Sequence, residues 1–118
     1  MADFEQLIHR AIESNLSIAQ IDSISASSHL PRNDLYNELA LIIARRFISG
    51  SMSFEDADLA INSIWSLMIM NTENDACLAE PAYSIYQAFD GGEYDHRDGD
   101  DPIEKFTKPR TAELLSEV

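Results

Sequence analysis

The chain has 118 residues, of which 45% are hydrophobic and 25% are charged, a length and composition typical of one folded domain and too apolar for a disordered chain. Its 21 Asp and Glu outweigh eight Lys and Arg, which gives a formal net charge of −13. A field of that sign repels nucleic acids and anionic lipids and attracts basic proteins, so we exclude the first two as partners.

The single cysteine, Cys77, cannot form an internal disulfide, which suits a reducing compartment. The opening "MADFEQLIHRAIE" lacks the basic start and the continuous apolar run of a signal peptide. No stretch approaches the roughly 20 apolar residues that cross a bilayer. We therefore expect a cytoplasmic protein with a single domain over residues 1–118.

The first expected element is an amphipathic helix over residues 2–15. Its apolar residues follow helical spacing and form one stripe: Phe4, Leu7, Ile8, Ala11 and Ile12. A short helix over residues 17–24 follows, and then a loop that ends at Pro31, because the serines of this region favour turns and caps.

Residues 32–51 and 54–70 predict two longer helices. The first has an apolar stripe of Leu35, Leu39, Ile42, Ile43 and Phe47 and ends at Gly50. Ser53 is placed as the N-cap of the second, with Glu55 and Asp56 in its first turn. Its apolar residues are numerous enough for the central helix of the fold, with Leu67 and Ile69 widening a face made by Phe54, Ala57, Ile61, Ile64, Trp65 and Met68.

Pro81 fits the first position of a helix over residues 81–90, which Gly91 and Gly92 end. A short last helix over residues 110–118 packs Leu114 and Leu115. No stretch alternates with the period of a strand. The sequence thus predicts an all-α, single-domain bundle of four or five main helices with an acidic C-terminal loop over about residues 90–105.

The acidic loop belongs to the stretch "DGGEYDHRDGDDPIEKF", residues 90–106. This stretch contains seven carboxylates and only two cations, Arg97 and Lys105. An EF-hand with Gly99 at its sixth position would place Tyr94 first and Lys105 twelfth, so that motif is rejected. A loose divalent site from Asp95, Asp98 and Asp100 is the weaker alternative. We predict no metal, no cofactor and no catalytic residues.

Two interpretations of this stretch stay open. It is either a solvated linker or a surface that meets a basic protein, with rim charges that set the association rate. The candidate partner-binding residues are Glu93, Tyr94, Asp95, His96, Asp98, Asp100, Asp101 and Glu104. Three tyrosines are candidates to supply the binding affinity for that partner: Tyr83, Tyr86 and Tyr94. Tyr83 and Tyr86 would equally fit a role in packing their helix against the core. Phe89, Tyr94 and Phe106 are candidates to pin the loop to the helices.

One segment of the sequence resembles a known protein family: residues 83–109, "YSIYQAFDGGEYDHRDGDDPIEKFTKP". The pieces Ala88-Phe89-Asp90, Gly92-Glu93-Tyr94, Asp101-Pro102 and Glu104 to Pro109 resemble a C-terminal signature of small acidic helical bacterial proteins. Some of these are immunity proteins of contact-dependent growth inhibition and related toxin systems. The resemblance implies a cytosolic antitoxin, without catalysis of its own, that silences one cognate toxin, often a basic nuclease.

The signature is either structural or part of the interface. Two other functions also stay open: a small metal-dependent or hydrolytic enzyme that uses the carboxylates of residues 93–104, and a generic acidic adaptor. For the antitoxin we expect a monomer that forms a one-to-one complex.

Overall fold

The computed structural model of the chain describes residues 2–70, 80–92 and 103–117. Within these ranges there is no strand, and the all-α prediction is confirmed. The elements in chain order are α1 (Ala2–Ile12), α2 (Ile18–Ser28), α3 (Arg32–Ser49), α4 (Phe54–Met70), α5 (Ala82–Gly92), a π-helical segment η1 (Ile103–Thr107) and α6 (Lys108–Ser116).

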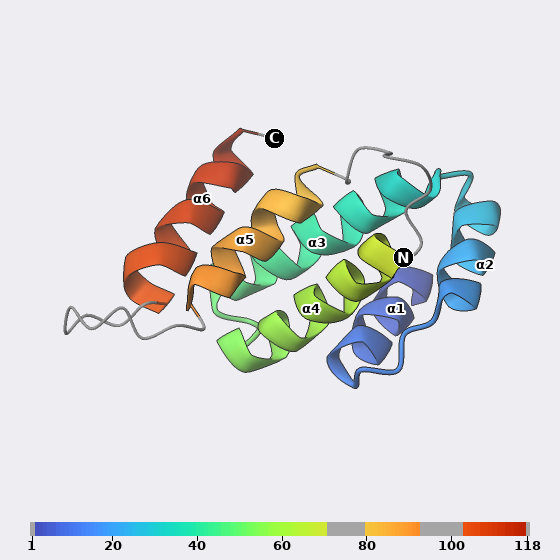
Figure 1. The fold of residues 1–118 in the computed structure, drawn as a ribbon, viewed down its shortest axis with the longest axis horizontal. Coiled ribbons are helices and arrows are strands. Elements are labelled where there is room, and N and C mark those ends of the chain that lie inside the picture. Colours follow the sequence, from blue (N-terminus) through green and yellow to red (C-terminus); the bar gives the residue numbers. More distant parts are fainter. Residues whose placement is uncertain (1, 71–79, 93–102, 118) are drawn as a thin grey trace.

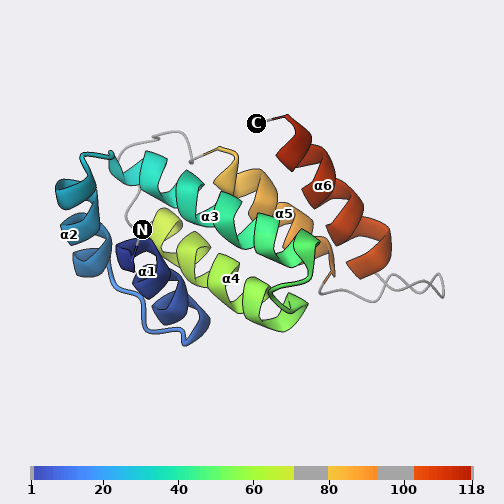
Figure 2. The ribbon, with the colours of Figure 1, turned by 180° about the vertical axis from the view of Figure 1, so that it is seen from behind.

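Helix α3 lies at the centre of the bundle. Figure 1 shows α2 and α6 at opposite ends of the molecule, with α1, α3, α4 and α5 between them. Seen from behind, α3 runs between α4 and α5 (Figure 2), and it contacts all five other α-helices. The helix of residues 54–70, which we expected to be central, packs against α1, α3 and α5 and shares the central position with α3. Leu35, Leu39, Ile43 and Phe47 are buried as predicted, and Tyr36, Ala40 and Ala44 are buried on further sides because α3 is surrounded.

The core continues into α4 and α5 through three phenylalanines. Phe54 stacks on Phe89 with 5.7 Å between the ring centroids. The ring centroid of Phe47 lies 5.1 Å from that of Phe89. Phe89 has no exposed surface. The predicted faces of α1 and α5 are confirmed by the burial of Leu7, Ala11 and Ile85, whereas Ile69 at the end of α4 is 50% exposed and does not widen the buried face.

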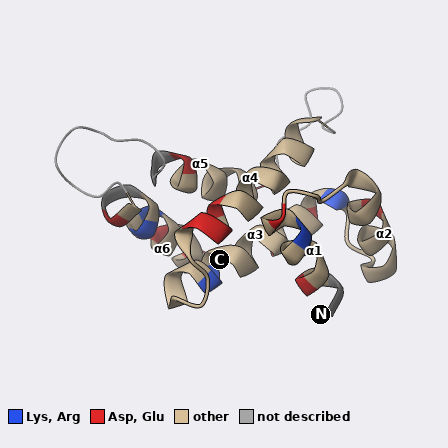
Figure 3. Cartoon of the chain, turned by 90° about the horizontal axis from the view of Figure 1, so that it is seen from below, with Lys and Arg blue, Asp and Glu red and all other residues tan. Residues whose placement is uncertain are grey.

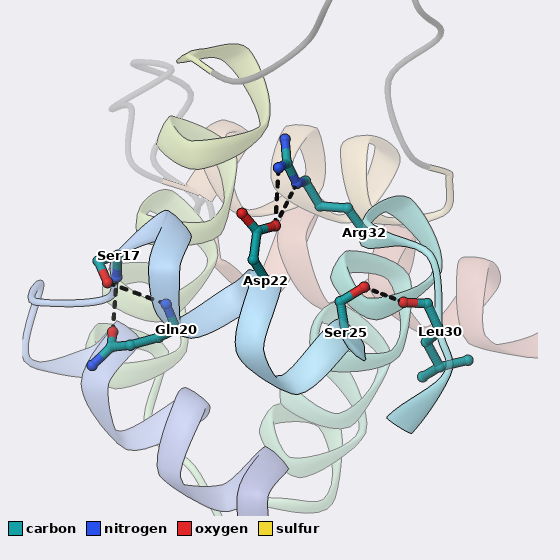
Figure 4. A network of polar contacts seen from close by, with 6 residues as sticks. All are labelled: Ser17, Gln20, Asp22, Ser25, Leu30 and Arg32. Atoms are coloured by element: carbon teal, nitrogen blue, oxygen red, sulfur yellow. Dashed lines mark hydrogen bonds and ion pairs between the residues drawn. The ribbon is translucent and has the colours of Figure 1, made fainter. Parts of the chain in front are cut away.

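Helix α2 is longer than predicted. It runs to Ser28, where the prediction ended at residue 24, and its N-terminus is a capping box in which Ser17 and Gln20 exchange backbone and side-chain hydrogen bonds (Figure 4). The serines that we expected to break the helix instead donate back to it. Ser28 Oγ donates to the Ile24 carbonyl at 2.6 Å. The helix ends at His29, whose φ of 59° is in the left-handed region.

Short polar contacts connect α2 to α3 (Figure 4). Both Nε and a terminal nitrogen of Arg32 contact the same oxygen of Asp22, at 3.1 and 2.9 Å. The Ser25 hydroxyl donates to the carbonyl of Leu30 in the connecting turn. These contacts hold the end of α2 beside the start of α3.

The predicted ends of α3 and α4 are confirmed. Gly50 has a φ of 86° and its backbone N–H donates to carbonyls of the last turn of α3, which is the conformation that favours glycine. The Ser53 hydroxyl accepts the backbone N–H of Asp56 at 3.1 Å, as an N-cap does.

Helix α5 begins one residue later than predicted. The Pro81 carbonyl accepts the Ile85 N–H, so Pro81 occupies the N-cap position and Ala82 is the first helical residue. Two side chains satisfy free N–H groups of the first turn. Glu80 accepts the Ser84 N–H at 2.8 Å, and Asn37, which comes from α3, accepts the Ala82 N–H at 3.0 Å.

The predicted boundaries of the acidic loop, about residues 90–105, were too wide. Residues 90–92 form the last turn of α5, and η1 begins at Ile103 and continues directly into α6. The reason is packing, since η1 lies against both α5 and α6 and the half-buried Ile103 packs on the core. Among the described helices, none is both long and apolar enough to cross a membrane.

Candidate partner-binding surface

Only one of the eight predicted partner-binding residues lies in the described ranges. Glu104 is exposed on η1, and its carboxylate pairs with the Lys108 ammonium at 2.7 Å, one turn further along the chain. The other seven, Glu93, Tyr94, Asp95, His96, Asp98, Asp100 and Asp101, lie outside the described residues, as does the side chain of Phe106.

The two ends of the acidic stretch are joined by buried contacts. The Thr107 hydroxyl, which has no exposed surface, donates to the Ala88 carbonyl of α5 at 2.7 Å. Ile103 is half-buried on the core at the start of η1. Phe89, which we expected to help pin the loop, is a core residue of α5. Residues 93–102 therefore connect two helical segments that pack against each other.

The described helices carry many more acidic than basic side chains, and several of the cations are already engaged. Figure 3 shows acidic positions on most of the helices and few basic ones. Arg32, Arg46, Lys108 and Arg110 each pair with a carboxylate of this chain. The remaining surface is left with exposed acids such as Asp34, Glu38, Glu55, Asp56 and Glu117.

One of these pairs joins α1 to α3. Two nitrogens of the Arg46 guanidinium donate to the two oxygens of Glu5, one of them at 3.0 Å. The hydrogen bond from Arg46 lowers the pKa of the Glu5 carboxyl, and the same bond raises the pKa of Arg46. Both groups are largely solvated, so this pair orients the two helices and adds little to stability.

Three aromatic rings form a second feature on the surface between α4 and α5. The Trp65 indole stacks on Tyr86 with 4.4 Å between centroids and 14° between planes, and on Tyr83 with 5.3 Å and 22°. All three side chains are half-buried. The Gln87 amide donates to the Tyr83 hydroxyl at 3.1 Å and fixes that ring. We call Trp65, Tyr83 and Tyr86 the aromatic stack.

Sequence reasoning found two members of the stack but not the third. Tyr83 and Tyr86 were candidates for affinity, and their separation of three residues places them on one side of a helix. Trp65 was assigned to the core face of its helix. Its partly exposed position follows from how α4 crosses α5, a tertiary relation that the spacing of apolar residues does not contain.

The described residues hold no group of three or more His, Cys, Asp and Glu that could bind a metal ion. The loose divalent site predicted from Asp95, Asp98 and Asp100 lies outside those residues. In comparisons with family models, curated proteins and solved structures, no match to this chain was found.

Proposed function

We propose that this chain is an immunity protein that binds one cognate bacterial toxin in the cytoplasm and neutralises it without any catalytic step of its own. The observation that carries the proposal is the concentration of seven carboxylates in residues 90–104 of a protein with a net charge of −13. The resemblance of residues 83–109 to the signature of small acidic helical proteins supports the same function.

The proposed mechanism is electrostatic occlusion. A nuclease toxin needs a basic active site because its substrate is a polyphosphate. Carboxylates on a firm helical scaffold compete for that site and also steer the two proteins together. The contacts that join both ends of residues 93–102 to the bundle support this role, because ordering of the ends before binding lowers the entropic cost of complex formation.

The test first asks whether a toxin gene directly precedes the gene of this chain, and it then uses the protein which that gene encodes. We expect a tight one-to-one complex whose association rate falls steeply as salt rises from about 0.01 to 0.15 M, because screening shortens the reach of the steering field. Replacing Asp98, Asp100 and Asp101 with Lys should weaken the complex while the circular dichroism of the bundle stays unchanged.

The matched control is the Lys substitution of Asp34, Glu38 and Glu117, three exposed acids among the described residues that give the same change in net charge. Equal weakening by both triple variants would mean that only total charge matters and that residues 98–101 are not the interface. Absence of any complex at low salt would refute the proposal.

A further inference from the structure

The aromatic stack has the features of a docking site for a cation. Trp and Tyr are among the residue types most enriched in the few residues that dominate binding energy at protein interfaces. Here they are held in place before any partner arrives, since Trp65 is fixed against both tyrosines and Tyr83 is fixed by Gln87. A rigid aromatic surface loses little side-chain entropy when a partner binds.

The ring geometry favours a planar ligand. The planes of Tyr83 and Tyr86 each lie within 22° of the Trp65 plane, so a flat group laid on the exposed part of the stack continues it. The quadrupole of an aromatic ring makes its face electrostatically negative, so the face attracts cations. Arg fits this surface better than Lys, because its guanidinium is planar and weakly hydrated, whereas the ammonium of Lys is a compact and strongly hydrated charge.

Carboxylates on the same two helices add charge complementarity. Asp58 precedes Trp65 by seven residues on α4, and Asp90 follows Tyr83 by seven on α5, so each acid shares a helix face with a ring of the stack. Because α4 and α5 run antiparallel (Figure 1), both acids lie toward the same end of the helix pair. Asp90 is also the first carboxylate of the acidic stretch.

We infer that the aromatic stack, with Asp58 and Asp90 two helical turns from Trp65 and Tyr83 on the same helix faces, is the docking site for an arginine side chain of a basic protein partner. This inference rests on the proposed function for the identity of that partner as a toxin. The arginine lies flat on the rings, and the carboxylates of Asp58 and Asp90 attract its positive charge.

Binding at this site can be followed by tryptophan fluorescence, because Trp65 is the single tryptophan of the protein. The probes are a hexa-arginine and a hexa-lysine peptide, titrated into the full chain at about 0.15 M salt, with Trp65 emission and calorimetry as the two readouts. We expect hexa-arginine to change Trp65 emission and to bind about three- to fivefold more tightly than hexa-lysine. Equal affinities, or saturation by hexa-arginine with unchanged emission, would overturn the inference.

Two variants test whether the preference for hexa-arginine comes from the aromatic stack. Tyr83→Leu should remove most of the preference for arginine and leave hexa-lysine binding unchanged. Leu59→Ala changes an exposed apolar residue on another face of α4 and should keep the preference. Far-ultraviolet circular dichroism confirms that both variants are folded. If Tyr83→Leu is folded and keeps the preference, the stack is not the docking site.

The same variants separate this inference from the proposed function. A toxin that binds the wild type and Tyr83→Leu equally tightly would refute the docking site and leave the immunity function standing. If the chain prefers hexa-arginine through its stack but does not bind a toxin encoded directly upstream of its gene, the immunity function is refuted and the docking chemistry stands.

Discussion

At the scale of single residues, Tyr36 is the buried group with the clearest energetic consequence. The side chain is 1% exposed, and its hydroxyl has no hydrogen-bond partner among the described residues. Burial raises the pKa of the Tyr36 phenol to about 12, with Arg32 lowering it and Asp22 raising it by smaller amounts. An unsatisfied buried hydroxyl costs about 1–3 kcal/mol.

We predict that Tyr36→Phe leaves the protein as stable as the wild type or raises its free energy of unfolding by about 1 kcal/mol. The phenol also makes wild-type stability depend on pH. Its folded pKa lies above the unfolded value, so the stabilisation is complete below about pH 10 and is lost as pH rises toward about 12. Urea unfolding at pH 8 and pH 11 measures both effects. A marked destabilisation of the variant at pH 8 would show that the hydroxyl has a partner.

Thr107 and Thr111 form a natural pair for comparison. Both are fully buried, one at the end of η1 and one in α6, but only the Thr107 hydroxyl has a partner, the Ala88 carbonyl. The Thr111 hydroxyl has none within the described residues. Replacement by Val keeps the branched shape and exchanges the hydroxyl for a methyl group.

We therefore predict that Thr107→Val lowers the free energy of unfolding by about 1 kcal/mol, whereas Thr111→Val leaves it unchanged or raises it. Denaturant unfolding of the two variants under one set of conditions is the measurement. Equal destabilisation by both substitutions would contradict the role of Thr107 in joining η1 to α5.

At the scale of elements, much of the fold follows from local sequence. Helical spacing gave α1, α3, α4 and α5 and most of their buried faces, and Ser53 and Gly50 marked helix ends by ordinary capping chemistry. The extra length of α2 was missed for a local reason, since Ser28 donates back to the Ile24 carbonyl of the same helix. The other misses have a different cause, which is contact between distant segments. The helical state of residues 103–105 and the packing of helices around α3 depend on neighbours that are remote in sequence.

The N-terminus of α5 shows this cause most directly. Its first N–H group is capped by Asn37, which is 45 residues earlier in the chain on α3. We predict that Asn37→Ala lowers the free energy of unfolding by about 1 kcal/mol, the typical cost of losing a cap. Asn37→Asp, which keeps the acceptor oxygen, should retain most of the stability in the same thermal or denaturant melt. A loss of the same size in Asn37→Asp would mean that the amide acts through other contacts.

At the scale of the whole molecule, charge is the property that the sequence states most clearly. Four of the described cations pair within the chain, so the acidic excess remains as a field around a compact helical body. The site was less predictable than the fold. Carboxylate spacing in residues 90–104 excludes a calcium loop but does not specify a geometry. The aromatic stack arises from two helices whose crossing no local pattern encodes.

The most direct test of the account is growth of bacteria that express a toxin encoded directly upstream of this chain's gene, with and without this chain. We predict that toxin alone stops growth and that co-expression of the wild-type chain restores it, whereas the Lys variant of Asp98, Asp100 and Asp101 protects less well at equal protein level. Unrelieved toxicity in cells that contain abundant, folded wild-type protein would contradict the immunity function.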